Sequence, residues 1–111
     1  MLPAVPNHMQ LVESDGSFSL TFSCGDLPAD TAIVATGHEP NGYFWEGMVR
    51  YLAPHLAEQV ELDAEAGLFA AYGERAALED VEALLRPYLD EGERVAATIR
   101  AAEESGFEFD D

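Results

Sequence analysis

The chain has 111 residues, of which 48% are hydrophobic, and this size and composition predict a single domain whose core needs no disulfide or metal. It carries 22 acidic residues against five basic ones, all arginine, which gives a formal net charge of −17. This charge disfavours direct binding to nucleic acid and to anionic membranes, and it favours association with basic proteins. Solubility alone remains an alternative reason for the acidity, although it needs only roughly 2 to 8 net charges in a small domain.

The N-terminal region and the cysteine content bear on the compartment. Residues 1–7 contain two prolines and no hydrophobic period, which predicts a loosely held arm. No basic region followed by a long apolar run appears, and no later run approaches the ~20 apolar residues that cross a bilayer. Cys24 is the single cysteine and cannot form an internal bridge, so a reducing compartment is favoured. We therefore expect a cytoplasmic protein with neither a signal peptide nor a membrane span.

The first predicted element pair is a β-hairpin. Residues 8–14 have the composition of a short strand, and Asp15-Gly16 is a strong turn signal. After the turn, apolar and Ser/Thr residues alternate, with the apolar set at Phe18, Leu20, Phe22 and Cys24. This alternation predicts a half-buried strand whose Ser/Thr face is solvated.

Two elements are predicted in the next part of the chain. In residues 26–37, Pro28 and Gly37 suit the two ends of a short helix, yet residues 32–36 would also suit a buried strand. The helix is favoured and the strand stays open. From residue 44, an apolar stripe at helical spacing predicts a second helix, which we expect Pro54 to end. The stripe comprises Trp45, Val49, Leu52 and Leu56.

The remaining elements complete an α+β pattern. Val60 and Leu62, a turn at residues 63–67 and a return strand at residues 68–72 predict a second hairpin with an acidic tip. A clean helical period spans residues 75–89, with Pro87 near its end, and a weaker helix over residues 91–104 places Val95, Ile99 and Ala102 inward. The expected fold is an antiparallel sheet of about four strands in two hairpins, with three to four helices packed mainly on one side.

The sequence offers no pattern for catalysis or cofactor binding. His8, His38 and His55 lack the spacing of a metal site, and His38 is expected to bond locally in its turn. The chain contains no lysine, which removes Schiff-base chemistry and the lysine of a phosphate-binding loop. Cys24 closes an apolar strand face, where an inert thiol is expected. We therefore predict no catalytic, metal or cofactor-binding residue, and an excess of carboxylates that singles out no acid/base pair.

Residues 37–47 hold the most informative segment. Asn41 is predicted to cap the helix that follows, and Gly42 to permit a backbone angle or a close approach that a side chain would forbid. Trp45, the single tryptophan, is expected to anchor the core with its indole N–H bonded to one acceptor, with an exposed contact role as the alternative. Tyr43 and Glu46, on the other side of the same turn, are the candidates for contact with a partner.

These residues carry a family resemblance. The run Asn41-Gly42-Tyr43-Phe44-Trp45-Glu46-Gly47, the stretch of residues 62–73 with Gly67 in its turn, and the strand of residues 18–22 resemble the immunity protein 51 family of bacterial polymorphic toxin systems. The resemblance covers most of residues 16–90. It implies an α+β cytoplasmic protein that binds and blocks a cognate toxin made by the same cell, with no cofactor and no turnover. Asn41, Gly42, Trp45, Gly47 and Gly67 are its expected structural positions.

The resemblance and the charge together suggest a mechanism. Glu39 and Glu46 near the helix start, and Asp63 and Glu65 at the hairpin tip, are expected to meet Arg or Lys of a basic toxin, with Tyr43 as a buried anchor. A nuclease is the favoured toxin, because nucleases are often basic in order to bind a polyanionic substrate. Two rivals remain: an acidic adaptor or nucleic-acid mimic that binds a basic host protein, and a small enzyme with a carboxylate pair in a cleft.

Overall fold

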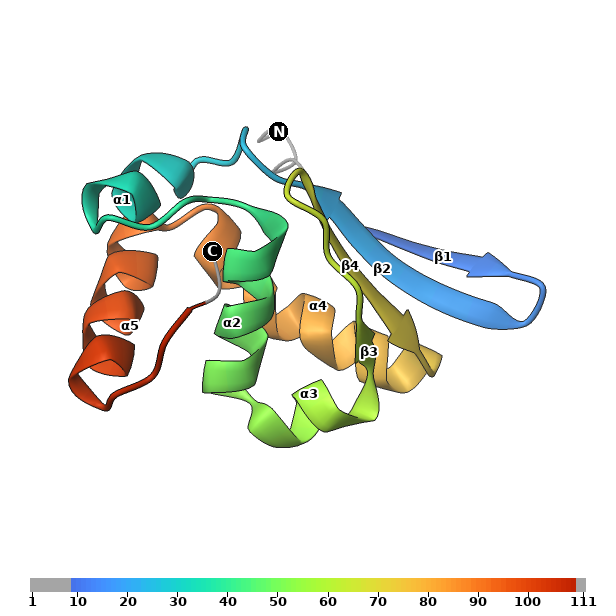
Figure 1. The fold of residues 1–111 in the computed structure, drawn as a ribbon. Coiled ribbons are helices and arrows are strands. Elements are labelled where there is room, and N and C mark those ends of the chain that lie inside the picture. The colour runs from blue at the N-terminus through green and yellow to red at the C-terminus, as the bar shows by residue number, and fades with distance from the viewer. Residues whose placement is uncertain (1–8, 110–111) are drawn as a thin grey trace, which may run out of the picture.

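A computed structural model describes residues 9–109, so the predicted arm at residues 1–7 and His8 lie outside the described part. Its sheet has four antiparallel strands in the order β1-β2-β4-β3 (Figure 1). These strands are β1 (Gln10–Ser14), β2 (Ser17–Ser23), β3 (Glu61–Leu62) and β4 (Leu68–Gly73). Both predicted hairpins are present, and the pairing of β2 with β4 joins them into one sheet.

The first hairpin turns where the Asp-Gly signal predicts it. Asp15 and Gly16 both adopt positive φ, at 52° and 81°, as a two-residue turn between twisted strands requires. The turn pairs Ser14 with Ser17, which places Leu20 and Phe22 on the buried face at 0% and 2% exposure. The predicted alternation is confirmed, although Ser19 and Thr21 on the opposite face are half-buried rather than fully solvated.

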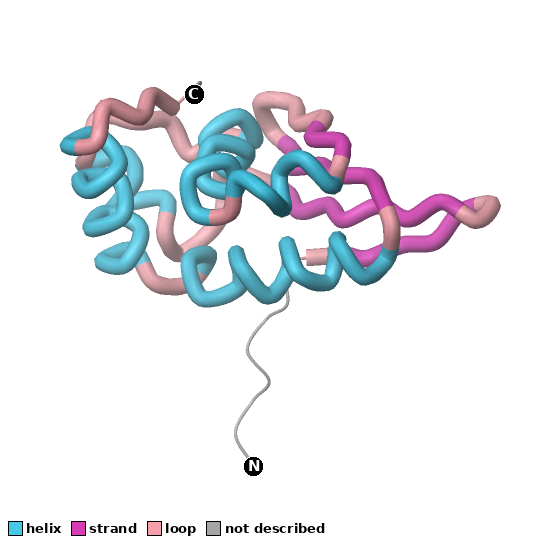
Figure 2. Tube along the Cα trace, turned by 90° about the horizontal axis from the view of Figure 1, so that it is seen from below, coloured by secondary structure: helices cyan, strands magenta, loops and turns pink. Residues whose placement is uncertain are grey.

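Residues 9–109 contain five helices, one or two more than expected. They are α1 (Asp30–Ala35), α2 (Gly42–Leu52), α3 (Pro54–Gln59), α4 (Arg75–Leu89) and α5 (Gly92–Glu104). The helical alternative for residues 26–37 is therefore correct, and the α+β class is confirmed. Figure 1 shows α2, α3 and α4 on one side of the sheet, with α5 beyond α2 and beneath α1. Seen from below, the β1–β2 hairpin projects beyond the helices (Figure 2).

Pro54 explains the additional short helix. The apolar stripe, which includes Leu56, predicted one helix with Pro54 near its end. In the structure α2 ends at Leu52, and Ala53 adopts a non-helical conformation. Pro54 is then the first residue of α3, a position where its fixed φ is helical and its missing N–H costs nothing. In α4, by contrast, Pro87 lies in the last turn and the helix continues to Leu89.

One core fills the space between the sheet and the helices. Phe22 of β2 stacks on Phe69 of β4 at a centroid distance of 4.8 Å and meets the edge of Trp45 of α2 at 5.8 Å. Val95, Ile99 and Ala102 of α5 are fully buried, as the helical period predicts. No helix in the described part of the chain is long and apolar enough to cross a membrane.

Candidate partner-binding surface

The start of α2 is fixed by Asn41. Its backbone is extended, with φ −110° and ψ 178°, and its side-chain oxygen accepts a 2.9 Å hydrogen bond from the Phe44 N–H. This bond satisfies one of the N–H groups that a helix leaves unpaired at its first turn. The predicted cap is confirmed, and it sets the direction in which α2 leaves the preceding loop.

Gly42 brings the start of α2 against the β3–β4 turn. The Gly42 N–H donates to the carbonyl of Ala66 at 3.2 Å. A β-carbon at position 42 would collide with the carbonyl oxygens of Glu65 and Leu68. The predicted close approach is confirmed, and its consequence is spatial: the segment around Glu39 and the acidic hairpin tip become neighbours.

Glu46 forms a second tie between the same two segments. One carboxylate oxygen accepts a 2.7 Å bond from the Ala64 N–H of the hairpin turn, and the other accepts a 3.1 Å bond from Arg50 one helical turn later. The residue is only 8% exposed. Glu46 therefore has an internal structural role and is left out of the candidate surface. The spacing to Arg50 could have indicated the ion pair, but no local pattern could have indicated the contact with Ala64.

The other four candidate residues are exposed. Tyr43 presents 40% of its surface to solvent, and Glu39, Asp63 and Glu65 are also exposed. The Asn41 amide donates to the Glu39 carboxylate at 3.4 Å, which holds that residue near the helix start. We call Glu39, Tyr43, Asp63 and Glu65 the acidic surface. Contact of this surface with a partner remains a prediction.

Similarity to known proteins identifies the family of the chain. The model of the family described as immunity protein 51 matches residues 9–104. The chain belongs to the immunity protein 51 family. The match extends beyond residues 16–90, the range that the sequence resemblance covers, and it includes α5. No curated protein and no solved structure matches the chain.

The tryptophan of this immunity protein 51 chain is a core residue. Trp45 is fully buried between the rings of Phe22 and Phe44. The expected acceptor for its indole N–H is absent: within residues 9–109 the nitrogen has no hydrogen-bond partner. An unpaired buried donor costs about 1–3 kcal/mol. Burying an aromatic side chain contributes about 4–6 kcal/mol, so the aromatic contacts outweigh the missing bond.

The chain after α5 returns to the start of α2. Phe109 stacks on Phe44 at 5.0 Å, and a β-carbon at Gly47 would lie 2.7 Å from the Phe109 ring. Gly47 therefore makes room for this contact. His38 Nε2 lies 3.3 Å from Glu103 Oε1 of α5, so the expectation of a local contact for His38 was incomplete.

Gly67 differs from the other motif glycines of this immunity protein. Its carbonyl accepts a 2.9 Å bond from the Cys24 N–H, which ties the hairpin turn to the end of β2. A β-carbon at position 67 would meet no atom within 4 Å. The structure therefore gives a role to the Gly67 backbone but no steric reason for glycine.

Charge is distributed unevenly over the molecule. All five arginines lie on helices, and four of them pair with a glutamate one turn away. The strands and turns of residues 9–109 carry acidic residues and neither lysine nor arginine. The strands and hairpin turns therefore contribute only negative charge, and Arg75, which follows β4 by two residues, pairs with Glu79 of its own helix.

An enzyme of the predicted alternative kind would place carboxylates of raised pKa in a cleft. Burial raises the pKa of Asp30, whose carboxylate accepts a 3.1 Å bond from the Leu27 N–H. One surface hollow is lined by the first turn and by residues of β2, β3, β4 and the start of α4, a second by the start of α5, and a third by the α1–α5 contact, and Asp30 lines none of these three. Within residues 9–109, no three His, Cys, Asp or Glu side chains are grouped to hold a metal ion.

Cys24 is expected to react slowly. Burial raises the pKa of its thiol from 9.0 to about 11, which lowers the thiolate fraction at pH 8 by about 100-fold. We therefore expect iodoacetamide to alkylate the folded chain about 100-fold more slowly than the urea-unfolded chain. Mass spectrometry of timed samples measures both rates, with glutathione in each buffer as the control. Similar rates in the two states would show that the thiol is accessible and ordinary.

Proposed function

We propose that this immunity protein 51 chain neutralises a cognate toxin by stoichiometric occlusion, without catalysis. The observation that carries the proposal is the family match over residues 9–104. The toxin that we propose is basic, with a nuclease favoured, because the net charge of −17 would attract such a domain over long range. The proposed site of this encounter is the cytoplasm of the cell that makes both proteins.

The acidic surface supports the proposed mechanism. Its three carboxylates come from two segments that Gly42 and Glu46 hold together, so they present one preorganised group of charges. Preorganisation lowers the entropy lost on association. Tyr43 follows Gly42 directly in α2, and its half-exposed ring supplies a rigid amphipathic contact of a residue type that is enriched in binding hot spots.

Growth protection is the direct test of neutralisation. A candidate toxin, encoded beside the gene of this chain, is expressed from an inducible promoter, alone or with the chain. We expect growth arrest by the toxin alone and growth with the chain present. A chain that protects against no neighbouring toxin, and forms no 1:1 complex with its inactive variant in calorimetry, would contradict the proposed function.

Charge reversal tests the acidic surface. The Asp63→Lys/Glu65→Lys double variant is expected to lower the association rate with the inactive toxin by at least about tenfold at low salt. Stopped-flow kinetics at 50 mM and 0.5 M salt measure the rates, and the difference should shrink at the higher salt as screening increases.

A matched control carries the same change of charge elsewhere. Glu93→Lys/Glu104→Lys reverses two exposed charges of α5, on the far side of α2 from the sheet (Figure 1). If the proposal is correct, this variant retains most of the association rate. Equal losses in both double variants would mean that only the total charge matters and that the acidic surface is not the contact.

A further inference from the structure

Within residues 9–109, the sheet has one face that no helix covers. Its helical side holds the core, and alternate residues of each strand point to the opposite side. On that side the strand register aligns four residues in a row across all four strands: Val12, Ser19, Tyr72 and Glu61. We call the face that carries this row the outer face.

Two features distinguish the outer face from a merely solvated surface. Val12 is 47% exposed and Tyr72 is 40% exposed, so two of the four large apolar side chains most exposed in residues 9–109 lie on it, one on each side of Ser19. Glu61 lies directly beside Tyr72 on the neighbouring strand. Within residues 9–109, neither the Glu61 carboxylate nor the Tyr72 hydroxyl has a hydrogen-bond partner.

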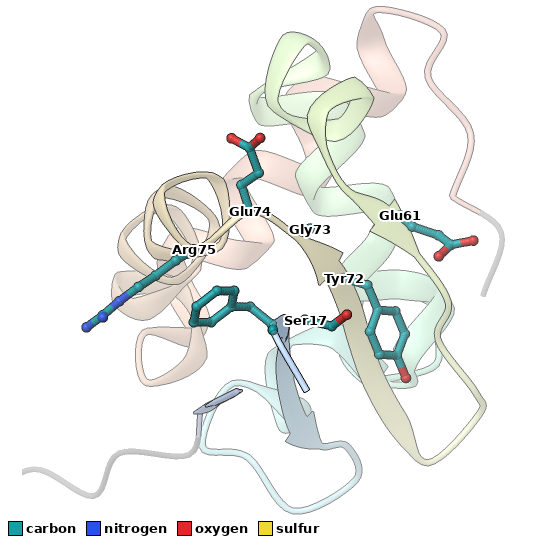
Figure 3. Close-up of a pocket in the computed structure, with 8 residues that line it drawn as sticks. Ser17, Glu61, Tyr72, Gly73, Glu74 and Arg75 are labelled. Atoms are coloured by element: carbon teal, nitrogen blue, oxygen red, sulfur yellow. The ribbon is translucent and has the colours of Figure 1, made fainter. Parts of the chain in front are cut away.

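The row ends in an open hollow of about 570 Å³. Figure 3 shows the Tyr72 ring and the Glu61 carboxylate extending from adjacent strands to the same side of this hollow. Arg75 also lines the hollow, but its side chain points away and pairs with Glu79 at 2.8 Å. The hollow therefore combines an aromatic face with a carboxylate and holds no cation of its own that could pair with that carboxylate.

We propose that the toxin docks on the outer face and places an arginine or lysine side chain in the hollow between Tyr72 and Glu61. A guanidinium can stack on a tyrosine ring while it pairs with a carboxylate, and this combination suits arginine in particular. Charge complementarity selects the occupant: the neighbouring turns add Asp15, Asp63 and Glu74 and no basic residue. The acidic surface then forms one end of a larger interface, and Tyr72 becomes its second aromatic anchor.

This inference rests on the proposed function, and the experiment separates the two. An inactive variant of the candidate toxin is titrated calorimetrically with the purified full chain and its variants. Tyr72→Ala is expected to raise the Kd by at least about 30-fold, as a hot-spot residue does. Tyr72→Phe keeps the ring and is expected to stay within threefold of the wild type. Glu61→Gln is expected to raise the Kd about tenfold and to weaken its salt dependence.

Glu104→Gln on α5 is the matched control for the lost charge, and circular dichroism confirms that each variant is folded. If Tyr72→Ala does not fold, Glu61→Gln and its salt dependence decide the question alone. Wild-type affinity in both Tyr72→Ala and Glu61→Gln would overturn the docking on the outer face and leave the proposed function intact. A wild-type chain that does not bind the toxin would overturn both.

Discussion

Replacing Trp45 with alanine is expected to lower the free energy of unfolding by about 3–5 kcal/mol, a large part of the stability of a domain this size. The side chain is fully buried, with Phe22 and Phe44 at ring-centroid distances of 5.8 Å and 5.3 Å. The cavity would open between α2 and the sheet, where these contacts hold the two layers together. Urea unfolding followed by far-ultraviolet circular dichroism measures the loss, because the variant lacks the tryptophan fluorescence signal.

Trp45→Phe is the informative companion. Because the indole N–H has no partner within residues 9–109, phenylalanine loses ring volume but no hydrogen bond. We expect the loss in free energy of unfolding to be less than half of the loss in Trp45→Ala. A loss below about 1 kcal/mol in Trp45→Ala would contradict the central position of the ring. An equal loss in both variants would point to a hydrogen bond that residues 9–109 do not provide.

The second large effect is expected at Gly42. A methyl group there would meet two backbone carbonyl oxygens of the β3–β4 turn, and backbone cannot rotate away as a side chain can. Gly42→Ala is therefore expected to destabilise the chain by about 3 kcal/mol or more, at the upper end of overpacking effects. Denaturant unfolding of the wild type and the variant measures the difference.

Gly67→Ala is the matched control within the same turn. A methyl group at position 67 would meet no atom within 4 Å. The free energy of unfolding of this variant is therefore expected to exceed that of the wild type by no more than about 1 kcal/mol. Equal losses in the two variants would mean that flexibility of the turn, and not the approach of α2, requires the glycines.

Local patterns predicted the elements of this fold well. The Asp15-Gly16 turn set the register of the first hairpin, and the apolar period gave α4 its observed bounds, Arg75–Leu89. Proline was less informative, since the same ring that ends a helix can begin one. Pro54 begins α3, whereas Pro87 remains inside α4. The residues around each proline do not separate these cases, because the break at Ala53 is a feature of the folded backbone and not of the apolar period.

The candidate site shows where sequence reasoning ends. The cap at Asn41 and the close approach at Gly42 follow from local chemistry, and the structure bears them out. The burial of Glu46 does not, because it depends on a contact between residues 18 positions apart. The register that aligns Tyr72 with Glu61 likewise requires the pairing of β3 with β4, so the outer face could not be recognised before the sheet was known.

The confinement of all five arginines to helices has a consequence for how the molecule moves in an electric field. Separation of the arginines from the carboxylates of the strands and hairpin turns gives the domain a dipole moment in addition to its net charge. A basic protein nearby would exert a torque on this dipole before any contact forms, turning the sheet toward itself. The chain would then meet its partner already oriented, and a larger fraction of encounters would involve the sheet instead of the helical side.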